Sequence, residues 1–456
     1  GQLVIRADGG PGIGSGHLGR CLALAEQWCA LGGDLKLVTK AAPRMWEERF
    51  RALGEIEGPY DGWQRAEAAW VVLDGYDLGQ DEQRRVKEAG RRLLVIDDHG
   101  SQGGYEADIV LDHNLDATPA SYHRIGPDTE LLLGAEYVLL RREFAGAASP
   151  SIPPEARRLL VLLGGSPPDG LVETVASAVA SSGLDVRQLD GSTEVAVAMA
   201  AADLALAGAG VTAWELCAMG IPSLLVVVAP NQLPVAAALH RVEAAVSLGE
   251  ASALNADRLG AELRSLAQDP DRRRHLSTNG RRLFDGRGAR RVVARLHARM
   301  LDLTPVTLSH ARLLWEWANE PGVRSAAFSP ATIPWDDHVR WLESQVADLA
   351  THFYVASRDG EPVGQVRFSV EDDHAEVHIS VRVDARRQGV GPALIAAGSR
   401  QLFADAPVRK VEARIRPDNV ASIGAFLDAG YRADGEGSDG GTRWLRYSLV
   451  RDASSS

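Results

Sequence analysis

A run of small residues directly after an apolar strand pattern constrains the fold of this chain most strongly. Residues 3–5 are apolar (LVI), and residues 12–20 read GIGSGHLGR. Apolar residues then recur at helical spacing up to Gly32-Gly33, at Leu18, Cys21, Leu22, Ala25, Trp28 and Cys29. This order predicts a strand, a glycine loop and an amphipathic helix. The N–H groups at such a helix start bind anions, and the small residues let a ligand approach the backbone.

The same loop matches the GxGxxG fingerprint of dinucleotide-binding proteins through Gly14, Gly16 and Gly19. That fingerprint needs an acidic residue at the end of the second strand, which holds a ribose hydroxyl. Here the second apolar run ends at Thr39-Lys40, and His17 stands between the second and third glycines. We therefore favour a phosphate-binding loop that carries an ionisable imidazole over an NAD site. A tight turn with a helix-capping histidine is the purely structural alternative.

Composition narrows the classes of protein. A chain of 456 residues that is 45% hydrophobic predicts two or three domains with large cores. Its net charge of −12 argues against a general nucleic-acid binder. No signal peptide and no membrane-spanning run is recognisable. The cysteines lie in apolar helical patterns without metal-ligand spacing, which is typical of core thiols in a reducing compartment. We expect a cytoplasmic protein that binds neither nucleic acid nor membrane; its oligomeric state stays open.

Three blocks of different patterning follow one another. Residues 1–148 and 156–301 alternate short apolar runs with helical patterns, on either side of a small and proline-rich stretch. Residues 304–450 show two helical stretches, hairpin strands and a glycine-bearing helix start. We predict an α/β chain of two Rossmann-like domains followed by an α+β domain. The strands expected in the first two blocks are 3–8, 35–39, 70–73, 93–96, 109–111, 131–133, 159–163, 186–189, 204–207 and 224–228.

The second block contributes further glycine segments. Gly164-Gly165-Ser166 follows one predicted strand, and Gly210 precedes a helix that contains Thr212 and Glu215. The N–H groups of that helix start and the Thr212 hydroxyl suit a pyrophosphate. Glu215 is placed to accept hydrogen bonds from ribose hydroxyls, or it only complements the helix dipole. Two amides stand where side chains often face a ligand crevice, just beyond the next strand: Asn231 and Gln232.

This ordered set of motifs, over residues 1 to about 300, resembles the nucleotide-sugar hydrolase family of pseudaminic acid biosynthesis, which shares the GT-B fold of MurG-type glycosyltransferases. The segments that carry the resemblance are Arg6-x-Asp8, the glycine loop with His17 and Arg20, Leu73-Asp74-x-Tyr76, Ile96-Asp97-Asp98, Gly134 to Arg141, Gly164-Gly165-Ser166, Gly210 to Glu215, and Asn231-Gln232. The chain departs from the family where Pro167-Pro168 intervene before Asp169.

The resemblance implies a GT-B arrangement and a metal-independent reaction in which water attacks the anomeric carbon and releases UDP from a diacetamido-trideoxy-hexose. His17 has the right type of pKa for the base or proton shuttle. For Asp97 and Asp98, the sequence allows a structural role in a turn or helix cap as readily as a role in the cleft. The resemblance implies that the following residues bind the substrate or its nucleotide: Arg6, Asp8, Gly14, Gly16, Arg20, Tyr76, Gly165, Ser166, Gly210, Thr212, Glu215, Asn231 and Gln232.

In the third block, a strand runs into Arg386-x-x-Gly389-x-Gly391 and then a helix. Successive N–H groups there suit the pyrophosphate of coenzyme A, and the strand suits its pantetheine arm. This order resembles the GNAT acyltransferases over residues 306–450, which implies acetyl-CoA as cosubstrate. The positions that match its binding residues are Ile379, Val381, Val383, Arg386, Arg387, Gln388, Gly389, Val390, Gly391, Pro392, Ala393, Asn419 and Ser422.

Acetyl transfer to an amine needs a proton acceptor. Strand alternation puts Glu376, His378 and Ser380 on one face. Glu376 or His378 could act as the base, directly or through water, although a solvated strand face is the structural alternative. Phe426 stands where the family often has a tyrosine that protonates the leaving thiolate.

Together the two resemblances predict a bifunctional enzyme that acetylates the 4-amino group of a UDP-amino-dideoxy-hexose and then hydrolyses off UDP. Three alternatives stay open. The first is a glycosyltransferase, because the GT-B fold serves both water and sugar acceptors. The second is a GNAT domain that acts on a protein N-terminus or another amine. The third is a non-catalytic sensor of sugar nucleotides.

Overall fold

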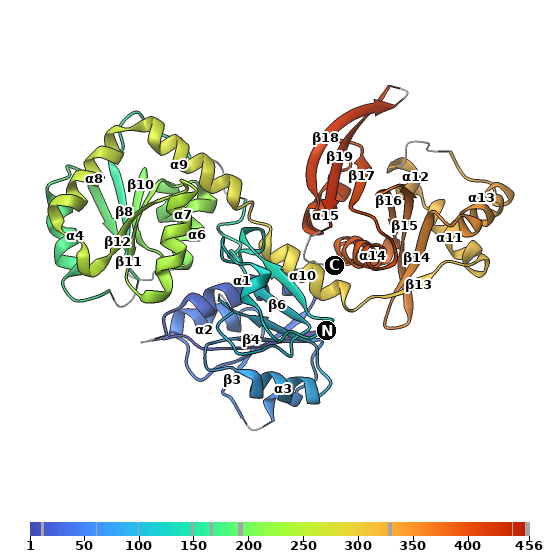
Figure 1. Ribbon diagram of the computed structural model, residues 1–456, viewed down its shortest axis with the longest axis horizontal. Helices are drawn as coiled ribbons and strands as arrows, with labels where there is room; N and C mark the ends of the chain where they lie inside the picture. Colours follow the sequence, from blue (N-terminus) through green and yellow to red (C-terminus); the bar gives the residue numbers. More distant parts are fainter. Residues whose placement is uncertain are drawn as a thin grey trace. The chain divides into compact units, whose positions relative to one another are not determined.

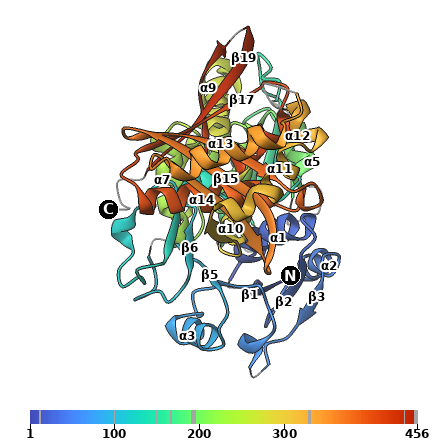
Figure 2. The same cartoon turned by 90° about the vertical axis from the view of Figure 1, so that its right-hand side faces the viewer.

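The chain is described here by a computed structural model that covers residues 1–10, 13–60, 62–98, 100–146, 150–164, 167–189, 195–326, 331–439 and 441–451. It divides into two compact units, Gly1–Ala289 and Arg290–Ser456 (Figures 1 and 2). The first unit holds two parallel sheets and the second holds one mixed sheet. The predicted class, two Rossmann-like sheets followed by an α+β region, is confirmed.

The first sheet is parallel, with the strand order β3-β2-β1-β4-β5-β6-β7 (Figure 1). Because the order reverses between β1 and β4, the carboxyl ends of these two strands flank the crevice where such sheets bind ligands. The strands are β1 (Gln2–Ala7), β2 (Asp34–Val38), β3 (Glu55–Glu57), β4 (Trp70–Asp74), β5 (Leu93–Ile96), β6 (Ile109–Asp112) and β7 (Glu130–Leu133), and the helices are α1 (Gly16–Ala30), α2 (Arg44–Arg51) and α3 (Gln80–Glu88).

The second sheet is also parallel, with the order β12-β11-β10-β8-β9. Its order reverses between β8 and β10, so the carboxyl ends of these two strands flank a second position where such sheets bind ligands. The strands are β8 (Arg158–Leu162), β9 (Asp185–Gln188), β10 (Leu204–Gly208), β11 (Ser223–Val227) and β12 (Val246–Glu250). The helices are α4 (Leu171–Ala180), α5 (Val195–Ala201), α6 (Val211–Met219), α7 (Leu233–Arg241), α8 (Ala256–Gln268) and α9 (Pro270–Leu283).

The third sheet has the order β13-β14-β15-β16-β17-β19-β18, and all its neighbours are antiparallel except β16 and β17. The strands are β13 (Asp302–Pro305), β14 (Thr351–Arg358), β15 (Glu361–Glu371), β16 (His374–Val381), β17 (Lys410–Ile415), β18 (Arg432–Asp439) and β19 (Thr442–Val450). The helices are α10 (Gly288–Ala298), α11 (Ala311–Ala318), α12 (Pro321–Ala326), α13 (Trp335–Ala347), α14 (Val390–Asp405) and α15 (Val420–Asp428).

The pairing of β16 with β17 is short. Only His374, Ala375 and Glu376 face partners on β17. Beyond Glu376 the two strands are no longer paired, so the rest of β16 pairs with β15 alone. Backbone groups on that open side are able to pair with an extended ligand.

The boundary between the compact units falls earlier than the end at residue 301 expected for the second block. It lies between Ala289 and Arg290, inside α10. The end of α10 packs with the third sheet, because Ala298 is buried in one core with Phe368 and Tyr431. The expected division at 148 and 156 stays a prediction.

Candidate active site

Two glycine-led helix starts meet in the first unit. A Cβ added to Gly16, the first residue of α1, would lie 3.4 Å from Cγ2 of Val211, the first residue of α6. The first N–H groups of a helix have no acceptor within the helix, and its N-terminus carries a partial positive charge. Two such ends side by side, with the partly buried Thr212 in the first turn of α6, suit a diphosphate.

The loop before α1 is shaped by its own hydrogen bonds. The Gly10 and Gly14 backbones bond to each other in both directions, at N···O distances of 3.0 and 2.8 Å. Gly14 has a φ of +81°, a conformation that residues with a Cβ rarely adopt. Gly10 and Gly14 therefore close the predicted loop ahead of α1; Pro11 and Gly12 lie outside the described residues.

Arg6 and Asp8, both expected to contact substrate, are paired with each other. Two N···O distances of 2.7 and 2.6 Å join the buried guanidinium to the carboxylate. Asp8 also accepts hydrogen bonds from the Lys40 amide and the Thr39 hydroxyl, at 2.6 and 3.2 Å. Burial opposes ionisation, but these donors hold the pKa of Asp8 below its usual range. The pair joins the ends of β1 and β2 and braces the crevice wall.

Arg20 organises the crevice at the ends of β4 and β5. Its guanidinium donates to both oxygens of Asp74, at 2.8 and 2.7 Å, and to Asp98 at 3.0 Å. Asp74 is fully buried and also accepts from the Cys21 thiol at 3.3 Å. Although burial favours the neutral acid, the Arg20 charge holds the pKa of both carboxyls below the usual range. Arg20 therefore lies in the crevice as expected, but as the hub of an ion-pair cluster.

His17 lies beside this cluster, in the first turn of α1. Its ring meets the Tyr76 ring edge-on, with the centroids 5.2 Å apart. The exposed Tyr76 donates to Asp98 at 3.2 Å, and its oxygen lies 3.5 Å from the Asn231 amide nitrogen of the second sheet. The structure thus brings together three of the expected site residues, His17, Tyr76 and Asn231.

The end of β6 adds two residues that the sequence analysis did not select. Asn114 donates to Asp98 at 3.1 Å. His113 is 3% exposed, its ring lies 6.5 Å from that of Trp214 in α6, and its Nδ1 has no hydrogen-bond partner in the described part of the chain. Burial and the Arg20 charge lower the pKa of His113 to about 4, so the imidazole is neutral at pH 7. The signal available was their position directly after a buried strand.

The two neighbouring aspartates that follow β5 separate into different roles. Asp97 accepts from the Ser101 amide at 3.0 Å, from the Ser101 hydroxyl, and from the Tyr105 hydroxyl at 2.8 Å. It therefore shapes the turn, whereas Asp98 belongs to the crevice cluster. The structure thus shows the turn for Asp97, and a role of Asp98 in the cleft stays a prediction.

Two residues of the second sheet that were expected to contact the nucleotide have hydrogen-bond partners within the protein. Glu215 is 3% exposed, and its Oε1 accepts from Arg141 at 3.1 and 2.7 Å. Burial raises the pKa of Glu215 against the effect of Arg141. The Gln232 side-chain oxygen accepts from the amides of Ala209 and Val228, both at 3.1 Å, and so braces the loop before α6. Gly165 and Ser166 lie outside the described residues.

In the second unit, the expected coenzyme A segment leads into α14. Gly389 caps this helix with a φ of +77°, and Arg387 has a φ of +61°. Arg386 bonds to the Val381 carbonyl and the Glu320 carboxylate, and Gln388 bonds to the Asp384 carbonyl. These two side chains hold the loop. In the first turn Pro392 has no N–H and the Ala393 N–H donates to the Gly389 carbonyl at 3.3 Å, so the N–H groups suited to an anion are those of Val390 and Gly391. That turn contains Val390, Gly391, Pro392 and Ala393, while Ile379 and Val381 lie on β16 and Val383 is exposed before the loop.

A polar residue at the start of α15 stabilises this helix. Asn419 caps α15, because its side-chain oxygen accepts from the Ser422 amide at 3.1 Å. The assignment of Asn419 and Ser422 to the acetyl-CoA site stays a prediction. Phe426 is buried against Tyr431, whose own hydroxyl is buried and bonded to Ser399 at 2.8 Å. Neither ring offers an exposed hydroxyl as a proton donor.

The two candidate bases on β16 are not equivalent. Glu376 forms a two-point ion pair with Arg414, at 2.8 and 2.7 Å. His378 lines a cavity of about 420 Å³ between β14–β16 and the helices α11–α13. Burial and the Arg367 charge lower the pKa of His378, so its ring is neutral near pH 7 and able to accept a proton. The geometry favours His378 over Glu376.

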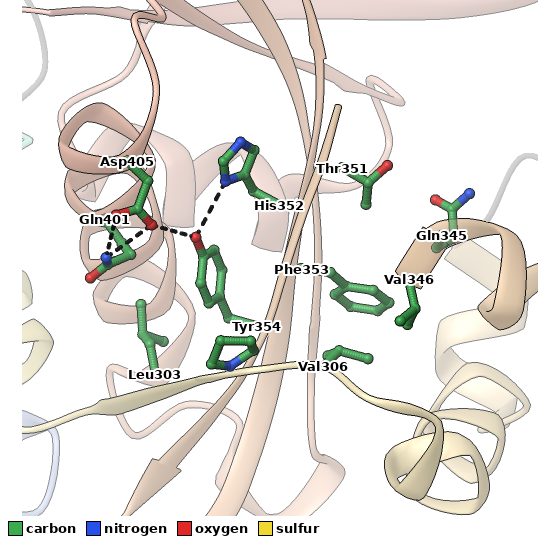
Figure 3. Close-up of a pocket in the computed structure, with 11 residues that line it drawn as sticks. Leu303, Val306, Gln345, Val346, Thr351, His352, Phe353, Tyr354, Gln401 and Asp405 are labelled. Atoms are coloured by element: carbon green, nitrogen blue, oxygen red, sulfur yellow. Dashed lines mark hydrogen bonds between the residues drawn. The ribbon is translucent and has the colours of Figure 1, made fainter. Parts of the chain in front are cut away.

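A second cavity, of about 360 Å³, lies at the edge of the same sheet (Figure 3). Its polar side chains bond to one another: Tyr354 donates to Asp405 at 2.7 Å, and Gln401 donates to both Asp405 oxygens at 3.0 Å. His352 lies 3.5 Å from the Tyr354 hydroxyl. These side chains therefore already form hydrogen bonds with one another.

The first unit thus holds two parallel sheets of Rossmann-like type, and the second holds a mixed sheet with the glycine-capped helix α14. Residues 300–432 match the family model of the acetyltransferase (GNAT) domain. The N-terminal region is 25% identical over 150 residues to the UDP-2,4-diacetamido-2,4,6-trideoxy-beta-L-altropyranose hydrolase of Campylobacter jejuni, covering 31% of this chain and 53% of that protein. The chain thus spans about half the length of the curated relative it matches.

Solved structures of acetyltransferases are also similar to a third of the chain. Aminoglycoside acetyltransferase AAC(6')-Ib with coenzyme A is 21% identical, with a TM-score of 0.31, covering 33% of this chain and 95% of that chain. Spermidine N-acetyltransferase from Vibrio cholerae with CoA and spermine is 16% identical, with a TM-score of 0.31, covering 33% of this chain and 96% of that chain.

No helix among the described residues combines the length and the apolar character that crossing a membrane requires. In the same part of the chain, no three His, Cys, Asp or Glu side chains gather as a metal site would need.

Proposed function

We propose that this chain acts twice on UDP-linked amino sugars, as a bifunctional enzyme of pseudaminic acid-type biosynthesis. Residues 304–450 would acetylate the 4-amino group of a UDP-amino-dideoxy-hexose with acetyl-CoA. Residues 1–148 and 156–301, in a GT-B arrangement, would then release UDP from the diacetamido-trideoxy-hexose by metal-independent hydrolysis. The likeness to the Campylobacter jejuni hydrolase and the GNAT match support this proposal. The three unpaired thiols suit a cytoplasmic location.

One observation carries the hydrolase half: the starts of α1 and α6 lie in contact, with His17 and Tyr76 beside them. UDP leaves with negative charge growing on its phosphate oxygens. Preorganised donors stabilise such charge most when water is excluded, and two helix starts supply them without reorganisation. Gly14 and Gly16 keep the backbone accessible to the diphosphate.

His17 is the residue we assign as base. Water attacks the anomeric carbon, the bond from that carbon to the phosphate oxygen breaks, and the water proton passes to the imidazole. Tyr76 fixes the ring from the side, and the buried Asp74 carboxylate provides negative charge close by. Arg20 holds that carboxylate in place.

The acetyl step uses the third sheet. When bound, acetyl-CoA supplies the activated acetyl group; the first turn of α14 receives its pyrophosphate and the open side of β16 its extended arm. The amine nitrogen forms the new C–N bond, the thioester C–S bond breaks, and His378 accepts the amine proton. Because Phe426 carries no proton to donate, we expect solvent to protonate the thiolate.

The test is NMR of the full chain with a UDP-4-amino-4,6-dideoxy sugar, with and without acetyl-CoA. We expect the N-acetyl product only with acetyl-CoA, and UDP release mainly after acetylation. His17→Ala should stop UDP release but not acetylation, whereas the matched variant of an exposed histidine, His123→Ala, should keep both. UDP formed only when an acceptor sugar is added would identify a glycosyltransferase instead. Full hydrolysis by His17→Ala would contradict the role of His17.

A further inference from the structure

The walls of the cavity beside His378 carry more positive than negative charge. Arg324, Arg367 and Asp337 line it, and Asp337 is already paired with Arg340. The chain as a whole has a net charge of −12, so this local excess runs against its composition. An anionic ligand of such a chain needs positive side chains gathered at its site. The cavity is therefore a candidate site for an anion.

Arg367 carries the charge in this cavity that lacks a counterion. In the described part of the chain it forms no ion pair, and the carboxylate that attracts it, Glu376, is itself bound at two points by Arg414. Burial lowers the pKa of Arg367 against the attraction of Glu376. A partly buried cation without a paired anion costs stability unless a ligand supplies the anion.

The Arg367 guanidinium is held on one side and available on the other. It lies over the Trp341 ring, 5.2 Å from the ring centre, and its Nη1 donates to the side chain of Gln345. Its Nε and Nη2 form no hydrogen bond in the described part of the chain, and the residue lines the cavity. Two N–H groups of a guanidinium fit two oxygens of one phosphate, in a planar arrangement that lysine cannot offer.

The strand register sets how far Arg367 lies from the candidate base. Arg367 on β15 faces His378 on β16, and both line the cavity. Directly opposite residues lie about 5 Å apart at their Cβ atoms, and the long arginine side chain carries its charge away from the strand to Trp341 on α13. In a nucleotide-linked 4-amino sugar, the amine and the phosphate-bearing carbon lie at opposite ends of the ring. Such a substrate requires a cation about one sugar ring away from the base.

We propose that Arg367 is a specificity-determining residue of the acetyl acceptor site, where its Nε and Nη2 bind the phosphate that is linked to the sugar. This inference rests on the proposed acetylation and adds the group by which the acceptor is recognised. It also orders the two reactions. Once UDP has been removed, the sugar no longer carries the anion that Arg367 binds, so acetylation is faster before hydrolysis than after it.

The test compares three acetyl acceptors in the full-length protein: the UDP-4-amino-4,6-dideoxy sugar, its 1-phosphate and the free amino sugar. CoA release is followed as an initial rate, before UDP is removed. We expect the wild-type KM to be about 10- to 100-fold lower for the two phosphorylated acceptors than for the free sugar. Arg367→Met should raise those two KM values to that of the free sugar, with kcat within about threefold and the KM for acetyl-CoA unchanged.

Two further variants serve as controls. Arg312→Met removes another arginine that lies over a tryptophan ring, Trp315, but its charge is already paired with Glu316. This variant should leave all KM values unchanged. Arg367→Lys keeps the charge without the planar pair of donors and should give intermediate KM values for the phosphorylated acceptors. An equal rate with the free amino sugar in all these proteins reports that each variant is folded.

The outcomes separate this inference from the proposed function. If the wild-type KM does not depend on the phosphate, or if Arg367→Met changes the KM of all three acceptors equally, the inference is overturned and the acetylation stands. A rise in the KM for acetyl-CoA alone would also overturn it, because the bound anion would then be a phosphate of the cofactor. If the wild-type protein acetylates peptides and not the sugar, the proposed acetylation fails, and the phosphate assignment fails with it.

Discussion

Replacing Arg20 by methionine should destabilise the first sheet by about 3–5 kcal/mol at pH 7, because one partner of a buried ion pair disappears while the others stay buried. Arg20 is 5% exposed, and its guanidinium provides three hydrogen bonds to Asp74 and Asp98. Methionine preserves much of the apolar packing, so the loss of stability reflects mainly the missing guanidinium charge. Arg44→Met removes an exposed ion pair with Glu48 and should change stability little.

The loss of stability expected for Arg20→Met depends on pH. In the native protein Arg20 outweighs burial and keeps the pKa of Asp74 low, so this stabilisation is present at neutral pH and is lost only as pH falls through that low value. Without Arg20, burial dominates and raises the pKa of Asp74. The carboxyl then takes up a proton more readily when folded, and the deficit should shrink between pH 7 and pH 5.

The assay is hydrogen–deuterium exchange of peptides from β1 and β4 in the full-length chain, corrected for the intrinsic exchange rate at each pH. It reports the local free energy of opening, so unfolding of the second unit does not interfere. A deficit below about 1 kcal/mol at pH 7, or one that grows as pH falls, would refute the reasoning about Arg20.

Gly14→Ala should lower the rate of UDP release measured by NMR and destabilise the first sheet by about 1–2 kcal/mol, because alanine is strained at a φ of +81°. His113 has a pKa of about 4 in the folded protein, so it takes up a proton more readily when the protein is unfolded. The free energy of unfolding should therefore fall by about 3 kcal/mol as pH drops from 6.5 toward 4. His113→Asn should remove this pH dependence of stability, measured by urea titrations. Arg273→Ala should cost about 3 kcal/mol in thermal unfolding, because this fully buried guanidinium bonds to carbonyls of the α8 end and of the linker before β8. His378→Gln should lower kcat for acetyl transfer about 10²- to 10⁴-fold, with Glu376→Gln having the smaller effect, and the reverse order would make Glu376 the base.

Local patterns predicted the elements that lie in the interior of the sheets. The strands β1, β4 and β10 are continuous apolar runs because helices cover both faces of a parallel sheet. In the two parallel sheets the missed strands lie at the edges: β3, with the sequence Glu-Ile-Glu, and β12. In the third sheet β13, β18 and the interior strand β19 were also missed. Edge strands need fewer apolar residues, so they carry a weaker signal.

The partners of polar side chains were harder to predict than the elements. His17, Tyr76 and Arg20 lie together at the first crevice, as the motifs indicated. Glu215 instead pairs with Arg141, which is 74 residues away along the chain. Such a partner depends on how two separate segments pack, and no spacing within one motif contains that information.

The amino-acid sequence by itself determined which segments are strands, where glycine permits a turn, and which helix starts offer N–H groups, because these properties depend on neighbours a few residues away. Only the tertiary structure decided which charges neutralise one another. That outcome follows from distances between residues far apart in the chain, as the pairing of Arg141 with Glu215 illustrates.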